Sequence, residues 1–171
     1  MSGEGNDKFK WAHILEINVM PTAYDVPADK LIDGIKDYLK KSGIINLPIF
    51  ATYSKTGSQA ERPPLDPDWY FYRAASILRK IYIYGPLSVK DLSKIYGGRK
   101  QRSFYLAHSQ PAGTKHIRKI LLDLEAAGLI KKTTSGRELT GKGKSTVDKI
   151  SSDIFDSLKG KIKAVEKLGI G

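Results

Sequence analysis

Apolar side chains recur at helical spacing along most of this 171-residue chain. Leu31, Ile35 and Leu39 fall at i, i+4 and i+8, which places them on one face of a helix. Pro27 suits the first turn of that helix, and Gly43 suits its end. The pattern therefore predicts an amphipathic helix between these two residues.

A second helix is predicted over residues 69–84, after a long ordered connection with four prolines. Asp68 stands where an N-cap is favoured. On a helical wheel one face is apolar, and the opposite face mixes cations with aromatic rings. The aromatic rings leave two interpretations open, a ligand-binding surface or a helix packed on both sides. The apolar face comprises Phe71, Ala75, Leu78 and Tyr82, and the mixed face comprises Tyr70, Arg73, Lys80 and Tyr84.

A capping box marks the start of a short third helix. Ser88 and Asp91 are three residues apart, so each side chain can bond a free backbone N–H at the helix start. The helix is predicted to end at Gly97-Gly98. The residues predicted to pack inward are Val89, Leu92 and Ile95.

A fourth helix is predicted after Thr114, which is expected to cap it. Ile117, Leu121 and Leu124 form its apolar stripe, with Ile120 beside it. Its first two turns carry cations, which oppose the helix dipole, so their position favours a function over stability. These cations are Lys115, Arg118 and Lys119.

The last third of the chain predicts a hairpin and a helix. The turn at Ser135-Gly136 joins the short strands "LIKK" and "RELT". From Ser145 helical spacing continues almost to the end of the chain. Its apolar positions are Val147, Ile150, Ile154, Leu158, Ile162 and Val165.

This order of elements predicts the fold class. A short helix, a longer helix, a two-stranded wing and a further helix is the order of a winged helix-turn-helix. The fold is therefore expected to be mainly α, with additional N-terminal helices before the winged-helix core. We expect an N-terminal tail or extension at residues 1–24, with Met20 as an alternative start, the winged-helix domain at 25–150 and a helical extension at 151–171.

The charge of the chain indicates what kind of partner it binds. The formal net charge is +11, which favours a nucleic acid or an anionic membrane surface as partner. No acidic residue occurs between Asp91 and Asp123, an interval that we interpret as a basic loop followed by the fourth helix. A solvated surface loop would explain the polarity, but ordinary surfaces mix both signs, so the one-sided charge indicates an anionic partner. The loop cations are Arg99, Lys100 and Arg102, and Arg137 of the wing adds another.

Several other chemistries are excluded or unsupported. The chain has no cysteine, which excludes disulfides, thiol catalysis and Cys-based zinc sites. The "GKGKST" stretch has Glu138 where a phosphate-binding loop requires glycine. The three histidines lack metal-ligand spacing. Nothing in these residues supports catalysis, and we expect no cofactor, no metal and no membrane association, in a soluble intracellular protein.

Four blocks together resemble one known family. These are "DWYFYRAASILRKIYIYGPLSV", "KIYGGRK", "IRKILLDLEAAGLI" and "GRELTGKGK", in this order. They are similar to small-subunit ribosomal protein nineteen of the archaeal and eukaryotic type, which differs from the bacterial protein of that number. The resemblance implies a structural protein without enzymatic activity in the head of the small ribosomal subunit, in the cytoplasm. Its implied partners are small-subunit rRNA and neighbouring ribosomal proteins, its free form is a monomer, and it supports subunit assembly.

The resemblance also implies some of the contacts. Arg73, Arg79, Arg99 and Arg118 match basic positions of the family motifs and are expected to bind RNA. Lys80, Lys100, Arg102, Lys115, Lys119 and Arg137 are predicted RNA contacts on charge alone. Phe104 and Tyr105 are candidates for stacking on bases, with hydrophobic anchoring of the loop as the alternative.

Two other classes compete with this interpretation. A winged-helix DNA-binding regulator would use the C-terminal helix for dimerisation. It gives no reason for cations and aromatic rings on the preceding helix over residues 69–84. A module that binds only proteins would not require a net charge of +11.

Overall fold

The computed structural model describes residues 21–102 and 105–167. Its helices are α2 (Ala28–Lys41), α3 (Ile49–Tyr53), α4 (Trp69–Tyr84), α5 (Val89–Ile95), α6 (Thr114–Ala126) and α7 (Gly141–Lys167). Its strands are β1 (Gly98–Arg102), β2 (Tyr105–Gln110), β3 (Ile130–Lys132) and β4 (Arg137–Leu139). The part of the chain described is mainly helical, as predicted, with two small antiparallel hairpins.

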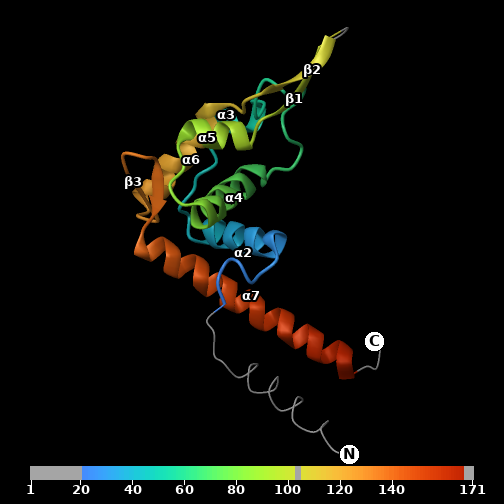
Figure 1. The fold of residues 1–171 in the computed structure, drawn as a ribbon, viewed down its shortest axis with the longest axis vertical. Coiled ribbons are helices and arrows are strands. Elements are labelled where there is room, and N and C mark those ends of the chain that lie inside the picture. The colour runs from blue at the N-terminus through green and yellow to red at the C-terminus, as the bar shows by residue number, and fades with distance from the viewer. Residues whose placement is uncertain (1–20, 103–104, 168–171) are drawn as a thin grey trace, which may run out of the picture.

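One apolar core joins all six helices of the described part of the chain. Ile35 of α2, Leu78 of α4 and Leu121 of α6 are all fully buried in one cluster. Val147 of α7 lies in the same cluster. Figure 1 shows α2 and α4 side by side, with α7 crossing beside α2 at one end of the molecule. Each of the apolar stripes predicted for α2, α4, α6 and α7 therefore contributes side chains to a common interior.

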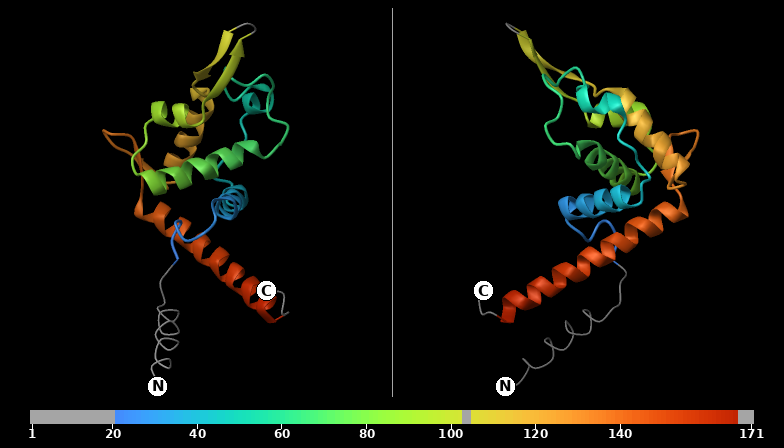
Figure 2. Two further views of the ribbon diagram at one scale, coloured as in Figure 1. Left: turned by 45° about the vertical axis from the view of Figure 1, so that its right-hand side comes forward. Right: turned by 180° about the vertical axis from the view of Figure 1, so that it is seen from behind.

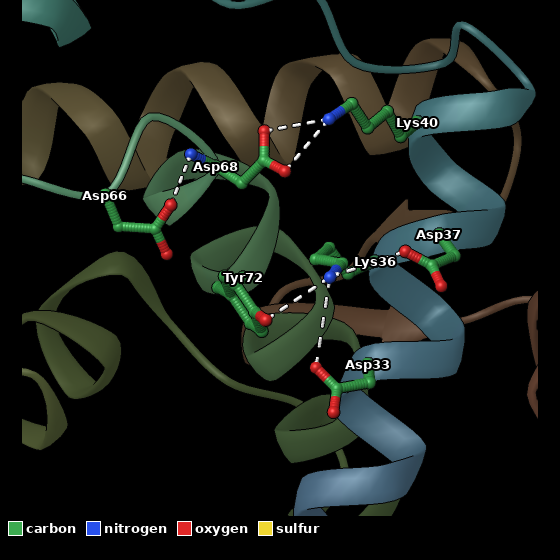
Figure 3. A network of polar contacts seen from close by, with 7 residues as sticks. All are labelled: Asp33, Lys36, Asp37, Lys40, Asp66, Asp68 and Tyr72. Atoms are coloured by element: carbon green, nitrogen blue, oxygen red, sulfur yellow. Dashed lines mark hydrogen bonds and ion pairs between the residues drawn. The ribbon is translucent and has the colours of Figure 1, made fainter.

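Polar contacts fix α2 against α4 (Figure 3). Both carboxylate oxygens of Asp68 accept hydrogen bonds from Lys40 at 2.9 Å. The ammonium group of Lys36 donates to the Tyr72 hydroxyl at 3.2 Å. Asp68 is the N-cap residue of α4, as predicted, but its side chain bonds Lys40 and makes no capping bond. These contacts hold one side of α4 against α2.

Several predicted helix features are confirmed. Helix α2 ends at Lys41, and Gly43 follows with a positive φ of 61°. Both bonds of the Ser88–Asp91 capping box are present at α5. The wing turn also forms where it was predicted, between β3 and β4.

Tyr70 is fully buried, which supports, for this residue, the interpretation of a helix packed on both sides. Other predictions were wrong in detail. Ile95 was expected to pack inward but is 44% exposed in the last turn of α5. Thr114 does not cap α6, since Gly113 is the N-cap residue and no side chain bonds there. Helix α7 begins at Gly141, before the predicted Ser145.

The basic loop is a β-hairpin, which is the largest correction. Strands β1 and β2 pair antiparallel, with Arg99 opposite Ser109 and Lys100 opposite His108. The register shifts between Lys100 and Arg102. Figures 1 and 2 show this hairpin projecting from the helical body at the end away from α7. Because it projects, no buried face forces apolar alternation, and the sequence carries no strand pattern there.

The predicted N-terminal tail falls largely on residues 1–20, which lie outside the described part of the chain. None of the helices in the described part is both long and apolar enough to cross a bilayer.

Candidate nucleic-acid interface

Helix α4 carries three cations, of which Arg73 and Lys80 lie seven residues apart on one side and Arg79 adjoins Lys80. Arg73, Arg79 and Lys80 are all partly exposed, and we call them the α4 cation group. Within residues 21–102 and 105–167, no carboxylate lies within ion-pairing distance of any of the three. The group therefore carries positive charge that the described protein residues leave uncompensated.

The ring of Tyr96, at the end of α5, makes cation–π contacts with two members of this group. The Arg73 guanidinium lies 4.1 Å from the centre of the Tyr96 ring, and the Lys80 ammonium lies 5.5 Å from it. The Tyr96 hydroxyl donates to Ser76 Oγ at 2.8 Å, which fixes the ring against α4. Cations over an aromatic face gain electrostatic attraction without being neutralised. The arrangement therefore orders the cations while leaving their charge available.

Burial makes these charges costly. It lowers the pKa of Arg73, because the surrounding protein solvates the charged form less well than water does. Burial also lowers the pKa of Lys80, and the neighbouring charges of Arg79 and Arg73 lower it further. The Nε atom of Arg79 is buried without a hydrogen-bond partner in the described part of the protein. A bound anion would relieve the repulsion between these charges.

A fixed hairpin base stands next to this group. Ser93 and Ala112 are joined by two hydrogen bonds, from the Ser93 hydroxyl at 2.6 Å and from the Ala112 amide at 2.9 Å. The Gly113 amide donates to the Thr56 carbonyl at 2.7 Å. Gln59 Nε2 donates to the Tyr96 carbonyl at 3.4 Å. These bonds hold the base of the β1–β2 hairpin on the body, beside the ring that carries Arg73.

The predicted cations of the hairpin lie on its strands. Arg99 and Lys100 are exposed on β1. Arg102 and Tyr105 are strand residues by their backbone, and Phe104 lies outside the described residues. The stacking role expected for the two aromatic residues therefore stays a prediction.

The cations of α6 and the wing have different surroundings. Lys115 lies over the Phe50 ring of α3, 4.3 Å from its centre. Lys119 is paired with Asp123 at 2.6 Å. Arg118 is exposed. Arg137 Nε donates to Glu125 at 3.0 Å. The predicted set therefore divides into the α4 cation group, the hairpin, and a separate region around α6 and β4.

Sequence reasoning missed Tyr96 as the residue that positions two cations. Tyr96 is 23 residues after Arg73, so helical spacing gives no signal for their contact. It also missed the burial of His116, which lies between the rings of Phe50 and Trp69. Among the described residues, no cluster of three or more acidic or histidine side chains could hold a metal ion.

Comparison with known proteins decides the family. A sequence model described as "Ribosomal protein S19e" matches residues 22–157, which is most of the chain. The chain belongs to the ribosomal protein S19e family. This confirms the resemblance to the archaeal and eukaryotic ribosomal family.

Individual S19e relatives match over nearly their whole length. Small ribosomal subunit protein eS19 of Thermoplasma volcanium is 39% identical over 142 residues, covering 83% of this chain and 95% of the relative. The protein of the same name from Aeropyrum pernix is 42% identical, covering 81% and 93%. The one from Entamoeba histolytica is 36% identical, covering 81% and 89%. Similarity to S19e proteins thus extends across archaea and eukaryotes.

Proposed function

We propose that this chain is a structural constituent of the small ribosomal subunit that binds small-subunit rRNA through the α4 cation group. The observation that carries the proposal is the set of three partly buried cations without a carboxylate partner among the described residues. The names of its S19e relatives, all small-subunit proteins, supply the subunit. The role is one of binding and assembly, without catalysis.

The chemistry of binding follows from this site. Phosphate oxygens accept hydrogen bonds from Arg73 and Arg79 while neutralising the charge that crowds Lys80. The ring of Tyr96 keeps the Arg73 guanidinium ordered, so little side-chain freedom is lost on binding. The projecting hairpin, with Arg99 and Lys100, extends the contact to RNA farther from the body.

The fold supports a winged-helix arrangement. Leu87, between α4 and α5, exchanges two backbone hydrogen bonds with Arg137 of β4, at 3.1 and 2.9 Å. Leu87 therefore pairs with the wing as a short strand would. The chain then runs in the order α4, the strand-like Leu87, α5, α6 and the β3–β4 hairpin. In this interpretation α6 is the second helix of the helix-turn-helix, and the β1–β2 hairpin is inserted between its two helices. The domain boundaries proposed are 25–150 for this body and 151–171 for the extension.

The resemblance carries the finer points of the proposal. They are a place in the head of the subunit in the cytoplasm, neighbouring ribosomal proteins as further partners, a monomeric free state and a part in subunit maturation. A DNA-binding winged-helix regulator is the competing function. It leaves the α4 cation group unexplained, since that group lies on the helix before the helix-turn-helix.

Sedimentation of a tagged chain through a sucrose gradient at moderate salt tests the proposal. The tag is expected in the small-subunit fraction, and RNase treatment is expected to release it. A tag that stays at the top of the gradient, or that sediments only with DNA, would contradict a ribosomal role.

A further inference from the structure

A groove lies between α5, α6 and β4. Its volume is about 520 Å³. Three regions of the chain meet there, the start of α5, the outer face of α6 and the first residue of β4. Its lining comprises Ser88, Val89, Lys90, Arg118, Leu122 and Arg137.

The floor of the groove exposes an apolar side chain. Leu122 is 56% exposed, while its neighbour Leu121 is fully buried. Val89 lies beside it in the lining and is partly buried. A large aliphatic side chain in a hollow gains free energy when another apolar group covers it. The groove can therefore accommodate one apolar side chain of a binding partner.

Cations border this apolar floor. Arg137 is held in place by its bond to Glu125 and by the backbone pairing of its strand with Leu87. Arg118 and Lys90 are exposed, and neither is in an ion pair within the part of the chain that the structure describes. The groove thus combines one fixed guanidinium with two cations that are free to adjust.

The charge balance here differs from that at α4. Asp91 and Glu125 lie beside the groove, although each bonds an internal partner, Ser88 and Arg137 respectively. Three cations near two carboxylates make a weak site for a polyanion. The α4 cation group, which has no described carboxylate partner, is the better site for RNA. An exposed apolar side chain in a groove bordered by arginines is typical of the core of a protein–protein interface.

We propose that this groove binds an acidic segment of a neighbouring small-subunit protein, with one apolar side chain on Leu122 and carboxylates on Arg118 and Arg137. The inference rests on the proposed ribosomal function, because this chain contacts the partner protein only within the small subunit. It assigns these two arginines to a protein partner in place of the RNA contact predicted from sequence.

Site-specific photo-crosslinking tests the inference. The probe is a benzoylphenylalanine incorporated at Leu122 of the tagged full-length chain, and irradiation is done on purified small subunits. A matched probe replaces Tyr84, which is 67% exposed at the end of α4. Crosslinking only the small-subunit fraction separates failure of this inference from failure of the ribosomal role, because a chain that never enters the subunit yields no such fraction.

The expected product from position 122 is a protein adduct that resists RNase and maps by mass spectrometry to a segment rich in Asp or Glu. Arg118→Ala should lower its yield by at least about fivefold, the effect of about 1 kcal/mol at an interface. The probe at Tyr84 should not give the same adduct. An adduct that RNase removes, a partner segment without acidic residues, or no adduct in subunits that contain the probe would each overturn the proposal.

Discussion

The guanidinium of Arg73 lies over the ring of Tyr96, 4.1 Å from its centre. The two residues come from different parts of the chain, Arg73 from α4 and Tyr96 from the end of α5, and the contact orders a cation that has no described acidic partner. A partly buried charge of this kind lowers stability unless something compensates it. The contact therefore links the fold of the α4–α5 pair to the capacity to bind an anion.

Replacing Arg73 by Met should separate binding from folding. Met keeps an apolar side chain over Tyr96 but removes the charge, so the free energy of unfolding should change by less than about 1 kcal/mol. Binding to small-subunit rRNA should weaken, and the log–log salt slope should fall by about 0.7. Thermal melts and filter binding measure the two effects. An unfolded variant, or an unchanged slope, would show that Arg73 has only a structural role.

Adjacent leucines on α6 should differ sharply in their effect on stability. Leu121→Ala should lower the free energy of unfolding by about 2–5 kcal/mol, because the side chain is fully buried and its loss leaves a cavity. Leu122→Ala should cost less than about 1 kcal/mol, since that side chain is 56% exposed. Urea unfolding of the two variants is the measurement. Equal losses would mean that the α6 face is misassigned.

The wing should depend on the absence of a side chain at Gly136. A Cβ there would lie 2.6 Å from the carbonyl carbon of Leu87, which is backbone and has little freedom to move. Gly128 also has a positive φ, 71°, but a Cβ there meets nothing within 4 Å. Gly136→Ala should therefore destabilise the protein by at least about 1 kcal/mol more than Gly128→Ala. Similar losses in urea unfolding would count against the Leu87–Arg137 pairing.

His116 should make stability depend on pH. Burial lowers its pKa from the ordinary 6.5, and the charges of Arg73 and Lys115 add to the effect against an opposing hydrogen bond to Lys55. Between the unfolded pKa and the lower folded pKa, the unfolded chain binds more protons. Stability is therefore fully present above about pH 6.5 and is lost as pH falls through the folded pKa.

Urea unfolding at about pH 7.5 and about pH 5.5, on either side of the unfolded pKa, measures this dependence. His116→Gln should reduce the difference between the two pH values, because the titrating group is gone. A difference that persists in His116→Gln would assign the pH dependence to other groups.

Local signals in the sequence predicted local structure well. The Ser88–Asp91 capping box and the apolar stripe of α6 depend only on residues within a few positions of each other, and both are present. The wing turn at Gly136 is equally local. Each of these features follows from spacing along one element.

Features that depend on distant contacts could not be predicted in the same way. The helical wheel left two interpretations open for Tyr70, and only the packing of α4 on more than one side decides that this residue is buried. The β1–β2 hairpin has no buried face, so its strands lack apolar alternation. The Arg73–Tyr96 contact joins two helices whose arrangement the chain pattern does not specify.

The central claim is that the α4 cation group binds small-subunit rRNA, and its most direct test is the salt dependence of that binding. The purified chain is compared with a triple variant, Arg73→Gln, Arg79→Gln and Lys80→Gln, whose folding is checked by thermal melting. A matched control removes three exposed charges elsewhere, Lys30→Gln, Lys41→Gln and Lys149→Gln.

The triple variant should lose about 2 from the log–log slope, which corresponds to about 0.7 for each phosphate contact, and the control should lose much less. A folded triple variant that binds the rRNA with the slope and affinity of the original chain would contradict the claim.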